Sequence, residues 1–214
     1  DSSTSRGLGD VYKRQLDDLS YATALAKSGS EAPLVGGPIG LMWGILLSTT
    51  LLTHWAIVTG VLAVKFQYLW LLWIIYSLLG AFGSAILGKR IATKTGVQSM
   101  ANRVEHAVWS MFTLMLACLW VGIVISMLLG MGSLAMFDLV PIVGFAGQGL
   151  AYGVTAKISH HKWLAWASGA AFLACMLCLP TFGQPMLYLI AAIATVFTVV
   201  LPSLKTIGFE YASQ

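Results

Sequence analysis

The chain has 214 residues, of which 58% are hydrophobic and only 9% are charged. A water-soluble domain usually carries about a quarter of its residues as charged side chains, so this composition excludes a soluble globular protein. The mean hydropathy of +0.83 places the chain in a lipid bilayer. The formal charge is +4, but the basic residues are spread between apolar runs, which predicts contacts with anionic lipid and not with nucleic acid.

The beginning of the chain is predicted to be foreign to the protein. Residues 10–15 read D-V-Y-K-R-Q, which one reading frame of the transposase end sequence used in sequencing libraries encodes. We therefore expect residues 1–15 to be a non-native tail and leave them out of the fold argument. A disordered polar tail is the alternative, and it would leave the fold argument unchanged.

Residues 16–35 are expected to form a short helix and a linker on the cytoplasmic side. Leucines and alanines recur at helical spacing over residues 16–27, and Asp17 and Asp18 fall in the first turn of this helix. The segment is too short and too polar to cross a bilayer. We expect it to lie on the inner membrane surface, with docking on a partner as the alternative.

Residues 36–205 contain six apolar segments, each close to the ~20 residues needed to cross the hydrocarbon of a bilayer. This pattern predicts an all-α integral membrane protein, a bundle of six transmembrane helices. Prolines at Pro141 and Pro202 are tolerated there, near helix ends or as kinks. Residues 206–214 are expected to be a cytoplasmic tail, and the predicted spans are about 38–58, 66–87, 106–129, 134–156, 163–179 and 186–204.

The basic residues predict the orientation of the bundle. If the N-terminus is inside, Lys65 is the only lysine or arginine after residue 16 that falls on the outer side. Positive charge accumulates on the cytoplasmic side of membrane proteins, so both termini are predicted to be cytoplasmic. The residues then inside are Lys27, Lys89, Arg90, Lys94, Arg103, Lys157, Lys162 and Lys205.

Small residues recur at a spacing of four in the first four predicted spans. Such faces let helix backbones approach closely in lipid, where packing drives association. A compact bundle is therefore expected, although the same small residues would also suit the lining of a pore. The predicted packing positions are Gly36, Gly40, Gly44, Gly80, Ser84, Gly88, Gly122, Ser126, Gly130, Gly149 and Gly153.

Few polar side chains lie deep in the predicted spans. Gln148 and Tyr152 are one turn apart in the fourth span, where they would hold a ligand or make hydrogen bonds between helices. On the outer side, Asp138 and His54 would bind a cation or relay a proton. The alternative is that Asp138 caps its helix and His54 is an interfacial residue.

Three polar residues open the third span on the inner side. A glutamate and a histidine that enter a membrane together would gate protons or bind a metal, and contacts with lipid headgroups explain the same residues. The adjacent histidines His160 and His161 make a poor metal site, because no cysteine or carboxylate lies near them in the sequence. The three inner residues are Arg103, Glu105 and His106.

Known catalytic and cofactor-binding motifs are absent from the sequence. It contains no H-E-x-x-H, no G-x-S-x-G and no Walker lysine loop. Cys175 and Cys178 form a C-x-x-C pair inside an apolar run, which favours a buried pair of small side chains over a redox motif. No catalytic residue, cofactor or metal is therefore expected.

One stretch carries a resemblance to other proteins. Residues 16–44 read L-D-D-L-x-Y-A-x-A-L-A-K-x-G-x-x-A-P-L-x-G-G-P-x-G-L-M-W-G, which resembles small uncharacterised inner-membrane proteins of Gram-negative bacteria. The resemblance implies a multi-pass protein of the bacterial inner membrane. It implies no activity and no site residues.

The scarcity of reactive side chains and the abundance of small-residue faces predict a non-enzymatic protein. We expect a partner or regulatory subunit, which binds the bilayer and either another protein or a second copy of itself. The alternative is a small transporter or channel for a small solute or ion, which would use Gln148, Tyr152 and Asp138. A membrane-embedded enzyme that uses Glu105 and His106 is a further alternative.

Overall fold

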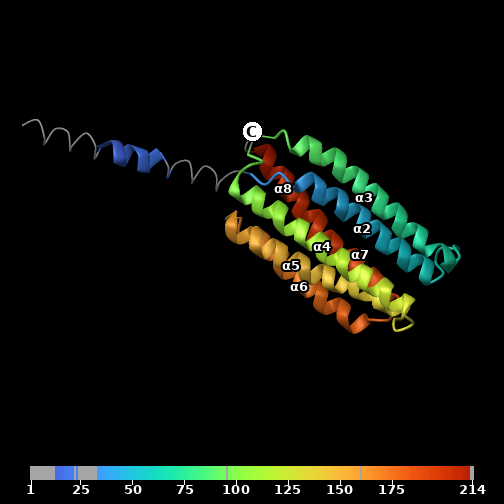
Figure 1. The fold of residues 1–214 in the computed structure, drawn as a ribbon. Helices are drawn as coiled ribbons and strands as arrows, with labels where there is room; N and C mark the ends of the chain where they lie inside the picture. The colour runs from blue at the N-terminus through green and yellow to red at the C-terminus, as the bar shows by residue number, and fades with distance from the viewer. Residues whose placement is uncertain (1–12, 22, 24–32, 95, 160, 213–214) are drawn as a thin grey trace, which may run out of the picture.

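The computed structural model of the chain describes residues 13–21, 23, 33–94, 96–159 and 161–212. Within these residues the protein forms helices and no strands. Six of the helices are long and apolar enough to cross a membrane. The predicted all-α bundle of six membrane-spanning helices is therefore confirmed for the described part of the chain (Figure 1).

The six spans follow one another along the chain, and short 3-10 turns precede or follow three of them. A π-helical turn interrupts the last span. The spans are α2 (Gly37–Val58); Phe66–Tyr68 followed by α3 (Leu69–Ile91); α4 (Met100–Leu128); Leu134–Asp138 followed by α5 (Leu139–Ile158); α6 (Trp163–Cys178) followed by Leu179–Thr181; and α7 (Met186–Thr195), the π turn (Val196–Val200) and α8 (Leu201–Ala212).

Two helix ends differ most from the sequence prediction. α4 begins at Met100, earlier than expected, because the Ser99 hydroxyl accepts a hydrogen bond from the Asn102 backbone N–H and caps the helix. The last helix continues to Ala212, through residues that were expected to form a tail. Glu210 is buried there and pairs with Lys94 at 2.5 Å, which explains why this segment is held against the bundle.

The segment before the bundle is helical over residues 13–21 and at residue 23, and these residues are exposed. Figure 1 shows this helix in blue. Part of the expected interfacial helix, including Lys27, lies outside the described residues. Its position on the membrane surface stays a prediction.

The six spans are arranged as a row. α3 packs mainly against α2, α2 against the last span, the last span against α6, α6 against α5, and α5 against α4. The start of α2 and the end of α8 lie at the same end of the bundle (Figure 1). We call this the terminal end, and it corresponds to the predicted inner side.

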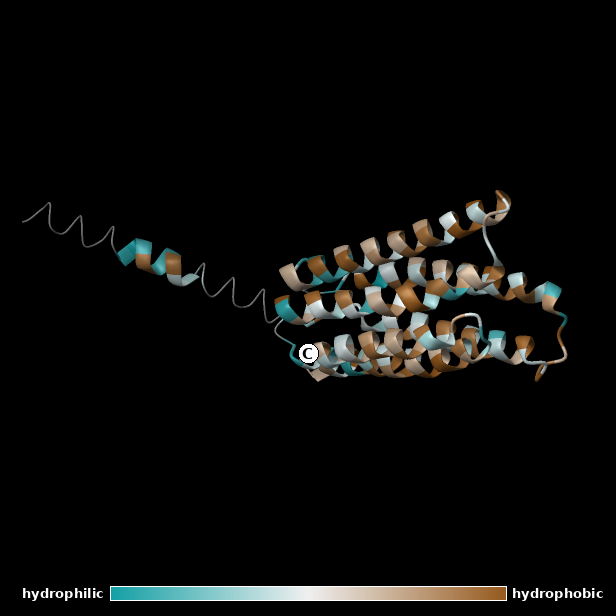
Figure 2. Cartoon of the chain, turned by 90° about the horizontal axis from the view of Figure 1, so that it is seen from below, coloured by the Kyte–Doolittle hydropathy of each residue, from teal (hydrophilic) through white to brown (hydrophobic). Residues whose placement is uncertain are grey.

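At the terminal end, α4 also contacts the segment that leads into α2. The amide oxygen of Asn102 in α4 accepts a hydrogen bond from the Val35 N–H, which lies just before α2, at 3.0 Å. α3 and α4 remain the edge helices of the row, and hydrophobic residues lie along the helices in Figure 2. Large exposed apolar side chains such as Trp70, Phe82 and Trp120 suit contact with lipid hydrocarbon.

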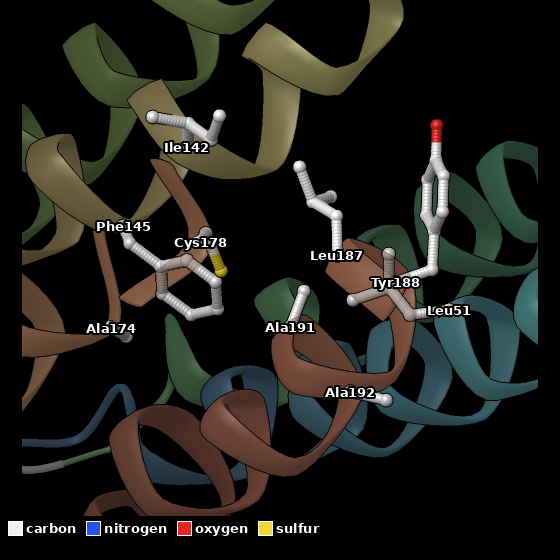
Figure 3. Packing of buried hydrophobic residues seen from close by; sticks show 9 residues of the cluster. All are labelled: Leu51, Ile142, Phe145, Ala174, Cys178, Leu187, Tyr188, Ala191 and Ala192. Carbon is white, nitrogen blue, oxygen red and sulfur yellow. The ribbon is translucent and has the colours of Figure 1, made fainter. Parts of the chain in front are cut away.

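Four helices share an apolar core towards the opposite end of the bundle (Figure 3). Four core residues, Leu51, Cys178, Leu187 and Ala191, are fully buried. Tyr188 extends away from the other labelled side chains, and its hydroxyl points out of the cluster (Figure 3). The core consists of Leu51 from α2, Ile142 and Phe145 from α5, Ala174 and Cys178 from α6, and Leu187, Tyr188, Ala191 and Ala192 from α7.

The π turn at Val196–Val200 directly precedes Pro202. Proline has no N–H, and its ring clashes with the carbonyl four residues earlier, which here belongs to Thr198. A wider turn relieves this clash, and the Leu201 N–H bonds to the carbonyl of Val196. The helix therefore continues past Pro202 but changes its packing at this point.

Candidate functional site

Asp138 is a buried carboxylate at the end of the bundle opposite the terminal end. Its side chain is 4% exposed. It accepts hydrogen bonds from the Tyr188 hydroxyl at 2.5 Å and from the Gly183 backbone N–H at 2.7 Å. Asp138 occupies the N-cap position of α5, but its side chain makes no capping bond. The carboxylate instead connects α5 with α7 and the loop before α7.

His54 is connected to this carboxylate through Tyr188. The rings of His54 and Tyr188 are stacked, with centroids 3.6 Å apart and an angle of 15° between their planes. Nδ1 of His54 accepts a hydrogen bond from the Trp73 indole N–H at 3.1 Å. The proton of the neutral imidazole is then on Nε2. The structure thus brings His54 and Asp138 into one cluster, and it buries His54 to 7% exposure.

Gln148 lies in the middle of the bundle and contacts the π turn. Its side-chain oxygen accepts a hydrogen bond from the Thr198 hydroxyl at 3.3 Å, and both side chains are buried. Tyr152, one turn further along α5, packs edge-on against Trp109 of α4 with ring centroids 5.2 Å apart. The two residues that the sequence placed together therefore contact different helices, and each connects α5 to a neighbour.

Asn102 organises the terminal end of the bundle. It is 5% exposed, and its amide oxygen accepts a hydrogen bond from the Val35 N–H at 3.0 Å. Its amide nitrogen donates to the carbonyls of Pro33 at 2.9 Å and Gly96 at 3.0 Å, and to the Ser99 hydroxyl at 3.0 Å. One side chain thus fixes the entry to α2, the loop after α3 and the start of α4.

The three polar residues that open the third span do not form one site. Glu105 accepts a hydrogen bond from the Gly36 backbone, and a Cβ atom on Gly36 would lie 3.0 Å from its Oε2. Arg103 and His106 are exposed. Glu105 packs against the start of α2, on a different side of α4 from these two exposed residues.

Glycines at six of the predicted packing positions lie against other parts of the chain. An added Cβ would come within 3.2 Å of a neighbouring side chain at each of them, and at Gly80 it would lie 2.1 Å from the Trp43 ring. Ser84, one turn away, accepts a hydrogen bond from the Trp43 indole at 2.9 Å. The six glycines are Gly36, Gly40, Gly44, Gly80, Gly149 and Gly153.

The predicted small-residue face of α4 has a different environment. Gly122 and Gly130 are exposed, and a Cβ added to either would meet no atom within 4 Å. The Ser126 hydroxyl bonds to the Gly122 carbonyl within the same helix at 2.9 Å. Cys118, one turn before Gly122, is also exposed. On α4 itself the uncovered small residues are therefore Cys118 and Gly122. Ser126 is half-buried and lies against Gly132, and Gly130 falls in the turn after the helix, with a φ of 71°. Gly88 of α3 also has no atom within 4 Å of an added Cβ.

The described residues contain no group of three or more histidines, cysteines or carboxylates that would hold a metal. His161 stacks on Phe209 with ring centroids 5.9 Å apart, and His160 lies outside the described residues. Cys178 is buried in the apolar core and Cys175 packs against it. Both cysteines are free, and their surroundings are those of small apolar side chains.

Sequence reasoning missed the partners of these residues. Tyr188 and Thr198 bind Asp138 and Gln148 from 50 residues away, and Trp73 binds His54 from the next span. No local pattern marks such pairs. Asn102 carried a weak signal, since it follows Ser99 by three residues at the start of an apolar run. The chemistry of the assembled site is hydrogen bonding between helices. Comparisons with protein families, curated proteins and solved structures found no match to the chain.

Proposed function

We propose that the protein is a multi-pass protein of the bacterial inner membrane that acts as a partner or regulatory subunit of a membrane complex. The proposal depends mainly on the uncovered small residues of α4, Cys118 and Gly122, which lie on an edge helix of the row. α4 packs mainly on α5 within the described chain. Small residues at successive turns let a second helix approach closely in lipid, and a face of this kind fits a helix of another polypeptide.

The hydrogen bonds of the buried polar side chains support the same proposal. Asp138 accepts two hydrogen bonds, Asn102 makes bonds to four groups of the chain, and Gln148 accepts one from Thr198. Side chains used in this way hold helices together and are not poised for a reaction. A scaffold or binding role requires no reactive side chain in addition to these.

The test is a mass measurement of the protein after gentle extraction from its own membrane. We expect a second polypeptide in fixed ratio to the chain. Gly122→Leu should release this partner, because the added side chain keeps a second backbone at a distance. Membrane insertion and thermal stability should stay unchanged, since no atom of the described residues lies within 4 Å of a Cβ at this position.

Gly169→Leu is the matched control. Gly169 lies in α6, is exposed and also has no atom within 4 Å of an added Cβ. This variant should keep the partner. A chain that is extracted without any second polypeptide, or a Gly122→Leu variant that keeps its partner as Gly169→Leu does, would contradict the proposal.

The second candidate function is the movement of a small ion across the membrane. It is favoured by three polar residues that lie at different depths of the bundle. Asp138 lies near one end of the bundle, Gln148 is about 15 Å further along α5 at 1.5 Å per residue, and Glu105 lies near the terminal end. Ionisable groups inside a membrane are costly and often mark ion pathways. The three residues would provide successive polar positions across the bilayer.

Proton flux into vesicles that contain the purified protein tests this second candidate. Asp138→Asn and Glu105→Gln should each abolish the flux, because the amides cannot release a proton. Arg103→Gln, at an exposed position, should not change it. A flux that both carboxyl variants retain, or wild-type vesicles no more permeable than empty ones, would rule out the pathway.

A further inference from the structure

An apolar groove runs between α6 and the last span. One part has a volume of about 410 Å³ and is lined by α6 and by both α7 and the π turn. A second part, of about 290 Å³, continues towards the terminal end between α6 and α8. Both parts share Ala170 and Phe197 as lining residues, so they form one continuous groove.

The groove is long enough for a lipid chain. Its lining on α6 extends from Trp163 to Leu177, which corresponds to about 21 Å at 1.5 Å of rise per residue. One leaflet contributes roughly half of the ~30 Å hydrocarbon thickness. The groove therefore starts at the terminal end and reaches beyond the middle of the bilayer.

The two spans stay apart here for local reasons. The α6 side of the groove includes Ala167 and Ala170, whose small side chains leave space. On the opposite side, the π turn and Pro202 change the path of the last span. Thr198, whose hydroxyl donates a hydrogen bond to Gln148, forms part of the wall of the 410 Å³ part of the groove. The rest of that wall is apolar, so hydrocarbon is the material that fits.

The terminal end of the groove carries positive charge and an indole donor without a partner. The Lys205 ammonium lies 5.1 Å above the Trp163 ring, and both residues line the groove. The Trp163 indole N–H is buried and has no hydrogen-bond partner among the described residues. The backbone N–H groups of Leu164 and Ala165 already donate to the carbonyls of His161 and Lys162, so the start of α6 favours an anion through the positive end of its dipole.

We propose that this groove binds an anionic phospholipid of the inner leaflet, with an acyl chain between α6 and the last span and the phosphate beside Lys205 at the start of α6. The phosphate oxygens accept hydrogen bonds from the Lys205 ammonium group, and the positive end of the α6 dipole adds to the attraction. The acyl chain covers the apolar walls. Charge and apolar shape occur together, which distinguishes this site from the general lipid contact of the other helices.

The experiment measures lipid binding to the full-length chain in detergent by native mass spectrometry. The probes are phosphatidylglycerol, phosphatidylcholine with the same acyl chains, and inorganic phosphate. We expect phosphatidylglycerol to bind more tightly than phosphatidylcholine. Lys205→Gln should weaken phosphatidylglycerol about fivefold, the usual effect of one basic residue near an anionic surface. Lys65→Gln, in the loop after α2, should leave binding unchanged.

The acyl-chain part of the site has its own variant. Ala170→Phe fills the centre of the groove and should weaken both phospholipids, whereas Ala165→Phe, at an exposed α6 position outside the groove, should not. Thermal unfolding of each variant shows whether it is folded.

Three outcomes would overturn the proposal or part of it. The headgroup site is overturned if the wild type binds the two phospholipids equally, or if Lys205→Gln binds phosphatidylglycerol as tightly as Lys65→Gln does. Unchanged binding in Ala170→Phe overturns the groove, and displacement of the lipid by inorganic phosphate shows a free-anion site instead.

Discussion

Asn102 is the residue on which the terminal end of the bundle depends most. Its amide bonds to four groups that lie in three segments of the chain. Asn102→Ala leaves the Val35 N–H and the Pro33 carbonyl without this partner. An unsatisfied buried polar group costs about 1–3 kcal/mol, so the free energy of unfolding should fall by at least this amount. Thermal or denaturant unfolding in detergent measures the change.

The neighbouring residue provides the control. Arg103 is exposed on the same helix, and Arg103→Ala should change the free energy of unfolding by no more than about 0.5 kcal/mol. Asn102→Asp keeps an acceptor for the Val35 N–H but places a buried carboxylate oxygen against the carbonyls of Pro33 and Gly96, and it should destabilise the protein at least as much as Asn102→Ala. An Asn102→Ala variant as stable as Arg103→Ala would show that water replaces these bonds.

At the scale of the element, the contact between α2 and α3 depends on the small residues of α3. The Trp43 ring lies against Gly80, and its indole N–H bonds to Ser84. Gly80→Ala would put a methyl group 2.1 Å from the ring. Overpacking of this kind costs about 1–3 kcal/mol, so the thermal midpoint should fall.

The same helix contains a matched control. Gly88 has no atom within 4 Å of an added Cβ, and Gly88→Ala should be neutral or raise stability, because alanine is the better helix former. Both variants add one methyl group to α3. Equal thermal midpoints for the two would mean that Trp43 moves aside without cost and that α3 is held only loosely.

The elements also show how much of the fold the sequence predicts. The six spans were predictable because bilayer thickness requires about 20 apolar residues for each crossing. The start of α4 and the continuation of α8 were missed, because Ser99 and Glu210 act through contacts that hydropathy does not register. The identity of each helix's neighbour was also out of reach, since apolar helices resemble one another in composition.

The candidate site was predictable only in part. Asp138, His54 and Gln148 stood out as rare polar residues in apolar spans, and all three are buried. Their partners were not identified, because Tyr188 and Thr198 each lie 50 residues away from the group they bind. A hydrogen bond over such a distance depends on how whole helices pack, which no local spacing encodes.

At the scale of the whole molecule, the orientation of the bundle in the membrane decides which leaflet the mouth of the groove faces. An even number of spans puts the start of α2 and the end of α8 at one end of the bundle (Figure 1). The same end holds Lys94, paired with Glu210, and Lys205 at the mouth of the groove. Because positive charge is retained on the cytoplasmic side, we expect this end to be inside.

Single cysteines and a membrane-impermeant maleimide test the orientation in intact cells. Cys118, Cys175 and Cys178 are first replaced by alanine. Val61→Cys, in the exposed loop after α2, should then react from outside, because this loop lies at the end opposite the terminal end of the bundle. Thr93→Cys, exposed after α3, should react only once the cells are permeabilised. The reverse pattern would place Lys205 and the groove mouth in the outer leaflet, and the lipid proposal would then have to be abandoned for the inner leaflet.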